Sequence, residues 1–146
     1  MQTKYHELPD YLLVEELQRH FNNLMNTVEG SNNIDYDGVV NSLWELADRQ
    51  WHTYEILENG TKGRVESFIN KVLLSELWKG KQVIFLRCLL SIIGNIGLSS
   101  SYALIKEIYN RDMPPIFKQE IFKLIDAVDK HEGGNVDDPY ITFKKG

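Results

Sequence analysis

The sequence predicts an all-α protein that forms one domain from residue 1 to residue 146. Apolar residues recur at intervals of three and four through most of the chain, and short polar segments containing Gly, Asn and Pro separate these stretches. Strand is expected at most around residues 51–58 or in the C-terminal tail. A chain of 146 residues is long enough to bury a core without disulfides.

The first predicted helix runs from Asp10, a potential N-cap, to about Val28, and Gly30 follows as a stop signal. A second helix is predicted from Asp35 or Asp37 to about Trp51. One face of the second helix is apolar and comprises Val40, Leu43, Ala47 and Trp51. The opposite stripe is polar and comprises Asp37, Asn41, Glu45, Asp48 and His52.

The turn at residues 58–63 precedes a third predicted helix, with Thr61 as its N-cap and an end near Trp78. Residues 83–96 are apolar almost all round, so we expect this fourth helix to be central to the core. A short helix at residues 102–110 comes next, and Pro115 suits the first turn of a last helix. The apolar residues expected to point inward from this last helix are Ile116, Phe117, Ile121, Leu124, Ile125 and Val128.

Long and short helices joined by brief polar turns are typical of a short HEAT/armadillo-like stack of helical hairpins. An irregular helical bundle is the alternative, and a loose tail is expected from about residue 133. The positions expected to be buried are Leu17, Phe21, Leu43, Phe68, Val72, Leu86, Leu89, Leu90, Ile93, Ile121 and Ile125.

Charge is distributed unevenly along the chain. Residues 1–60 carry three Lys or Arg and eleven Asp or Glu, which gives 3 − 11 = −8, whereas the remaining residues carry 13 − 10 = +3. A negative field repels nucleic acid and attracts basic proteins, although acidity also aids solubility. We expect a cytoplasmic protein, because no signal peptide is visible and no apolar run is long enough to span a bilayer.

The stretch "NIDYDGVVNSLWE" resembles a calcium-binding loop that begins at Asn33. Asp35, Asp37 and Gly38 occupy suitable positions, but the twelfth position, which should supply a bidentate Glu, is Trp44. Glu45 follows one residue late. We therefore interpret the stretch as the start of a helix and predict no metal site and no cofactor.

No residue set indicates catalysis. The four histidines are scattered, and Asp48 and His52 share a helix face without a third metal ligand nearby in the sequence. Cys88 lies in an apolar run that is expected to raise its pKa and make it inert. We predict no catalytic residues and no enzyme activity, with a small enzyme of unrecognised site as a further possibility.

Large aromatic residues adjoin acidic ones in the N-terminal half, which is typical of protein interfaces. Packing in the core is the alternative role for Trp44 and Trp51. The predicted partner-binding residues are Asp37, Trp44, Glu45, Asp48, Tyr54, Glu55 and Glu58.

Three apolar helical segments, "SLWELADRQW", "VIFLRCLLSIIGNIG" and "PPIFKQEIFKLIDAV", carry a resemblance to a known family. With them, the chain resembles the all-helical immunity proteins of bacterial contact-dependent growth inhibition and other polymorphic toxin systems. The resemblance implies a cognate toxin as partner, often a nuclease domain, whose active site the immunity protein covers. It implies no catalytic residue, no direct contact with nucleic acid and no membrane. The alternative function is that of a helical-repeat scaffold or adaptor without catalytic activity.

Overall fold

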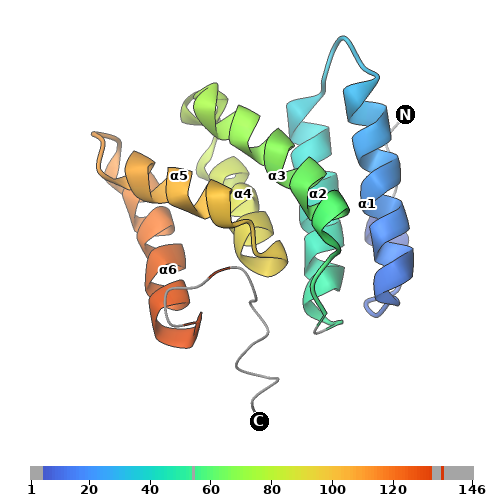
Figure 1. Cartoon of the computed structure of the whole chain (residues 1–146). Coiled ribbons are helices and arrows are strands. Elements are labelled where there is room, and N and C mark those ends of the chain that lie inside the picture. Colours follow the sequence, from blue (N-terminus) through green and yellow to red (C-terminus); the bar gives the residue numbers. More distant parts are fainter. Residues whose placement is uncertain (1–4, 54, 133–135, 137–146) are drawn as a thin grey trace.

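The computed structural model describes residues 5–53, 55–132 and 136, and every regular element among them is helical (Figure 1). The helices are α1 (Val14–Glu29), α2 (Tyr36–Trp51), α3 (Asn59–Leu74), α4 (Val83–Ile96), α5 (Ser99–Tyr109) and α6 (Pro115–Glu132), with the short 3-10 helices η1 (Tyr5–Glu7) and η2 (Leu77–Gly80). The predicted all-α fold is confirmed. The predicted loose tail from residue 133 lies outside the described residues, except for Val136, which is buried.

The six α-helices form two layers. α1, α3 and α5 contact one another in succession, and so do α2, α4 and α6. Each helix of the first layer also contacts the next helix in the chain, so the fold comprises three hairpins: α1–α2, α3–α4 and α5–α6. Figure 1 shows the first hairpin at one side of the molecule and the third at the other. The three hairpins pack against one another in a bundle-like arrangement, which fits both predicted forms, a short hairpin stack and a helical bundle.

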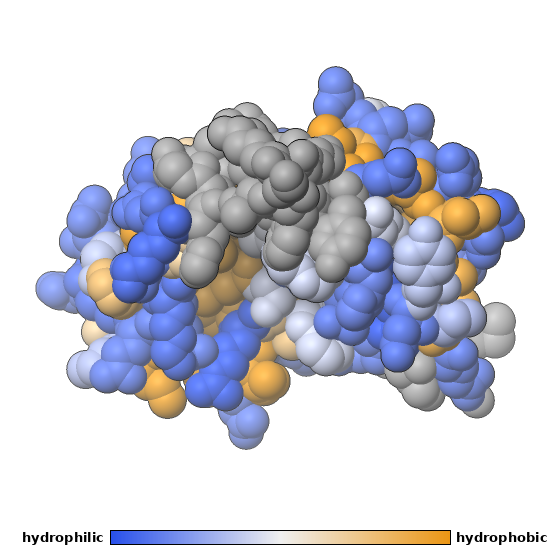
Figure 2. All heavy atoms as spheres, turned by 90° about the horizontal axis from the view of Figure 1, so that it is seen from below, coloured by the Kyte–Doolittle hydropathy of each residue, from blue (hydrophilic) through white to orange (hydrophobic). Residues whose placement is uncertain are grey.

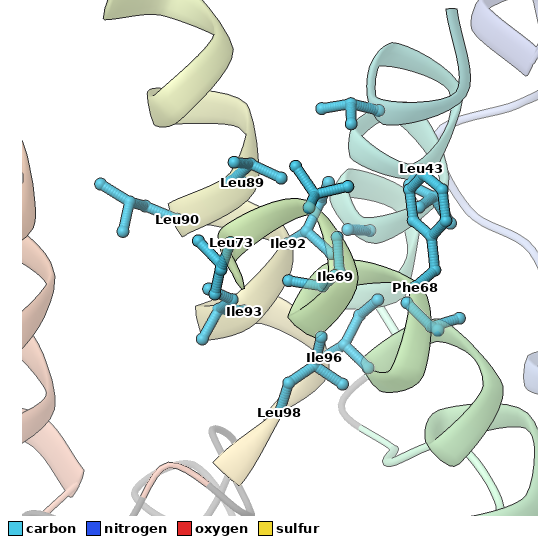
Figure 3. Packing of buried hydrophobic residues seen from close by; sticks show 14 of the residues in the cluster. Leu43, Phe68, Ile69, Leu73, Leu89, Leu90, Ile92, Ile93, Ile96 and Leu98 are labelled. Atoms are coloured by element: carbon cyan, nitrogen blue, oxygen red, sulfur yellow. The ribbon is translucent and has the colours of Figure 1, made fainter. Parts of the chain in front are cut away.

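α4 is the centre of the core, as its composition predicted. It contacts α2, α3, α5 and α6, and Leu86, Leu89, Ile92 and Ile93 are fully buried. Figure 3 shows Ile92 of α4 beside Ile69 of α3 and Ile93 beside Leu73, whereas Leu90 points toward α6. Of the eleven positions expected to be buried, only Ile125 is partly exposed. Burial of each such side chain contributes about 1.5–3 kcal/mol to folding.

Three predicted helix starts are wrong. α5 begins at Ser99 rather than at residue 102. α1 begins at Val14 rather than near Asp10, and the extended segment before it buries Leu12 in the core. α3 begins at Asn59 with Glu58 at the N-cap position, so Thr61 is not the cap. Thr61 is buried instead, where its hydroxyl accepts from Asn22 Nδ2 (3.0 Å) and joins α3 to α1.

The predicted end of α3 near Trp78 is also wrong. α3 ends at Leu74, and Glu76 adopts a left-handed conformation (φ 59°) before η2. This reversal places the buried Trp78 over the end of α3, where its indole Nε1 donates to the Leu73 carbonyl (3.2 Å). On α6, Ile116 is exposed rather than inward-pointing.

Hydrophilic side chains cover most of the face in Figure 2, and hydrophobic ones form separate patches. Within the described ranges, none of the helices is both long enough and apolar enough to cross a membrane.

Candidate partner-binding surface

The calcium-like stretch forms the start of α2, as predicted. Asp35 is the N-cap, and its Oδ1 accepts a hydrogen bond from the Gly38 backbone N–H (3.2 Å). This bond satisfies one of the donors that a helix start leaves without an intrahelical partner. In the part of the chain that the structure describes, no group of three or more His, Cys, Asp and Glu is placed to hold a metal ion.

Four residues of α2 form an exposed line along the helix, which we call the acidic stripe: Asp37, Asn41, Trp44 and Asp48. Their spacing of three and four residues places them on one side of the helix. The Trp44 side chain is 38% exposed, so a large ring is available on a polar surface. Asp37 forms an ion pair with Lys81 (2.8 Å), which precedes α4, and Asp48 lies 4.0 Å from Arg49.

Glu45 does not belong to the exposed surface, although the sequence predicted it there. Only 9% of Glu45 is exposed, and its Oε1 accepts from Asn41 Nδ2 (3.2 Å). The physical reason is that α2 is covered by α1, by α4 and by η1, so a single apolar face does not describe it. Arg49 is buried as well and donates to the Leu8 carbonyl (3.2 Å) from Nη2.

Two of the other predicted residues, Glu55 and Glu58, lie in the connection between α2 and α3. Glu55 and Glu58 are exposed, and Tyr54 lies outside the described residues. The Glu58 carboxylate accepts from the Thr61 hydroxyl (3.2 Å), and its backbone N–H donates to Gln18 Oε1 (2.6 Å). Asp37 lies in the first turn of α2, and Glu55 follows its last residue, Trp51. These two ends of the helix are about 21 Å apart, since a helix rises about 1.5 Å per residue. The predicted residues therefore do not form one compact cluster.

A groove of about 390 Å³ lies between α4 and α6, and the sequence did not predict it. Polar side chains converge there: Arg87 Nε donates to Glu120 Oε1 (2.7 Å), and Lys123 Nζ donates to Glu120 Oε2 (2.9 Å). Hydrogen bonds from Lys123 and from Arg87 lower the pKa of Glu120, and 8% of this residue is exposed. Ser91, Gly94 and Asn95 also line the groove.

Arg87 and Glu120 are 33 residues apart, so their pairing could not be read from the sequence. The one available signal was the charge of Arg87 within an otherwise apolar helix. A charge within such a helix marks the side that reaches solvent, and the Arg87 side chain is 49% exposed there.

Cys88 is half-buried, and burial raises the pKa of its thiol. This agrees with the expectation of low reactivity, because the thiolate is the nucleophilic form.

Comparisons of the chain with protein-family models, curated proteins and solved structures found no match. A function for this chain must therefore be inferred from its own fold and surface.

Proposed function

We propose that this chain is a cytoplasmic immunity protein that binds a cognate toxin, a basic nuclease domain, and neutralises it by covering its active-site surface. The observation that carries the proposal is the acidic stripe on α2, where a partly exposed Trp44 lies between Asp37 and Asp48. A nuclease needs a positive surface to hold phosphates, and an acidic inhibitor can occupy that surface in place of nucleic acid.

The charge of the N-terminal part supports this choice of partner. Residues 1–60 carry a formal charge of −8, and long-range attraction between opposite charges speeds association. The exposed ring of Trp44 would supply the apolar anchor that interfaces require, because tryptophan is enriched among residues that dominate binding energy. Asp48 contributes the charge at the next turn of the same stripe.

Binding to the product of a neighbouring toxin gene tests the proposal. Asp48→Lys is expected to slow association most strongly at low salt, and Trp44→Ala is expected to raise Kd by about tenfold or more through faster dissociation. Asp126→Lys on α6 is the matched control, since Asp126 is partly exposed and acidic but lies on another helix. Equal losses from Asp48→Lys and Asp126→Lys, or no loss from either α2 variant, would contradict a binding site on the acidic stripe.

A second candidate function is that of a scaffold or adaptor without catalytic activity. The two-layer hairpin stack favours it, because such stacks present extended rigid surfaces for partner proteins. A folded chain that neither binds the neighbouring toxin nor protects cells from it, yet copurifies with another complex, would favour this candidate.

A further inference from the structure

The groove between α4 and α6 carries an inference that does not depend on the toxin partner. We propose that this groove binds an acidic peptide segment of a partner protein, with a carboxylate of that segment received by Arg87 and Lys123. The site lies on other helices than the acidic stripe and has the opposite charge preference.

The charges of the groove favour an anion. Arg87 and Lys123 both pair with Glu120, so the three side chains carry a net charge of +1. Among the described residues, neither cation pairs with a second carboxylate, and their side chains are 49% and 71% exposed. A guanidinium has five N–H donors, of which Glu120 engages the one on Nε, so Arg87 retains donors for an incoming carboxylate.

Glu120 acts as a positioning residue for the two cations. It is more than nine-tenths buried, and a buried carboxylate is stable only when it is paired and hydrogen-bonded. The hydrogen bonds from Lys123 (2.9 Å) and Arg87 (2.7 Å) favour the ionised form of Glu120 and lower its pKa. Both cations are therefore held before a ligand arrives, which reduces the entropy lost on binding.

The floor of the groove suits a peptide. Gly94 leaves space for α6, because a Cβ at this position would lie 3.2 Å from Leu124 Cδ1. The Ser91 hydroxyl forms no hydrogen bond within the described part of the chain and can donate to a peptide carbonyl. Leu90 and Leu124 add apolar contacts, and a groove of about 390 Å³ exceeds what one small ion fills.

Nucleic acid fits this groove less well than a carboxylate does. Nucleic acid is bound by extended basic surfaces that neutralise several phosphates, whereas this groove presents two cations beside one carboxylate. A single carboxylate matches the planar fork of Arg87 and needs no more than these two cations.

Titration of the full chain, monitored by the backbone amide signals of Ser91, Gly94 and Asn95, tests the proposal. The probe is a capped hexapeptide with two Glu residues between Leu residues, and its Gln counterpart is the control peptide. The acidic peptide is expected to cause saturable shifts and to bind about tenfold more tightly than the Gln peptide, because hydrogen bonds between charged groups are the stronger ones. Absence of saturable shifts at these three residues, or equal binding of both peptides, would overturn the proposal.

Variants then assign the binding to the two cations. Lys123→Gln and Arg87→Gln are each expected to raise the Kd of the acidic peptide by about tenfold. Lys130→Gln is the matched control, since Lys130 lies on the same helix, is 68% exposed and pairs with Asp126. Sodium phosphate and a single-stranded oligonucleotide are titrated in two further experiments. Saturable binding of either at these amides, as tight as that of the acidic peptide, would contradict the assignment to a carboxylate.

Discussion

Lys81 Nζ lies 2.8 Å from Asp37 Oδ2, and this ion pair joins the first turn of α2 to the residues before α4. The Asp37 side chain is 63% exposed and that of Lys81 is 30% exposed. A double-mutant cycle with Asp37→Asn and Lys81→Gln should therefore give a coupling energy of about 0.2–1 kcal/mol that falls as salt is added. Urea unfolding measures it, and a coupling above about 2 kcal/mol would contradict the exposed geometry.

Glu45 and Asp48 are three residues apart on α2 but should respond differently to charge reversal. Glu45→Lys places a cation in a buried position and should lower the free energy of unfolding by about 3 kcal/mol or more. Asp48→Lys should change it by about 0.5 kcal/mol at most, because the side chain of Asp48 is 51% exposed. Urea unfolding of both variants is the measurement, and equal effects would show that Glu45 is accessible.

Leu89→Ala tests whether α4 is the centre of the core. Leu89 is fully buried, so the variant should lose about 2–5 kcal/mol of stability. The loss of stability in Leu90→Ala should lie toward the lower end of that range, because Leu90 lines an open groove where water can replace the lost atoms. Ile84→Ala on the same helix is the control, since Ile84 is 56% exposed and should change stability by about 0.5 kcal/mol at most. Similar losses from Leu89→Ala and Ile84→Ala would argue against a central α4.

The pairing of Glu120 with Lys123 and Arg87 should make the free energy of unfolding depend on pH in the acid range. Its carboxyl has a lower pKa in the folded chain than its ordinary value of 4.5, because Lys123 and Arg87 donate to the ionised form. The stabilisation is therefore present above the ordinary pKa and is lost as pH falls through the lowered one. Between about pH 6 and 3, the wild-type chain should lose more stability than Glu120→Gln in urea unfolding. Glu29, whose pKa is lowered by its hydrogen bond with Arg64, is present in both chains, so the difference between them isolates Glu120. Parallel pH profiles would contradict the pairing.

Cys88 should react slowly with an aromatic disulfide reagent in the folded protein. Burial raises the pKa of the thiol above its ordinary value of 9.0, so little thiolate forms at about pH 8. The rate should rise once urea unfolds the chain and exposes the thiol. Equal rates for the folded and unfolded protein would show that the thiol is accessible and unperturbed.

Much of the fold was predictable because local signals agreed with the packing. The fourth helix was predicted with its observed bounds, Val83–Ile96, since its apolar run ends at Gly97, which adopts a left-handed conformation (φ 84°) that favours glycine. The start of the second helix was predicted at Asp35 or Asp37, because an Asp before an apolar stretch is a common N-cap, and Asp35 is the N-cap of α2. In both cases the residues that decide the structure are neighbours in the sequence.

The errors arose where distant contacts decide the structure. Thr61 looks like a cap in the sequence, but its hydroxyl accepts from Asn22 on another helix. Glu45 looks exposed when α2 is treated as a helix with one apolar face. However, α2 is contacted by α1, η1 and α4, and Glu45 is buried. The groove was missed for the same reason, since Arg87 and Glu120 meet only after α4 packs against α6.

The order in which helices of the two layers alternate along the chain affects the rate of folding. The main contacts between helices join elements that are adjacent or next but one along the chain, so no large loop must close before the core begins to form. Proteins whose contacting residues are close together in the sequence fold rapidly, typically within microseconds to milliseconds for helical proteins. The first two hairpins can pack together as the second leaves the ribosome, before the third has been synthesised.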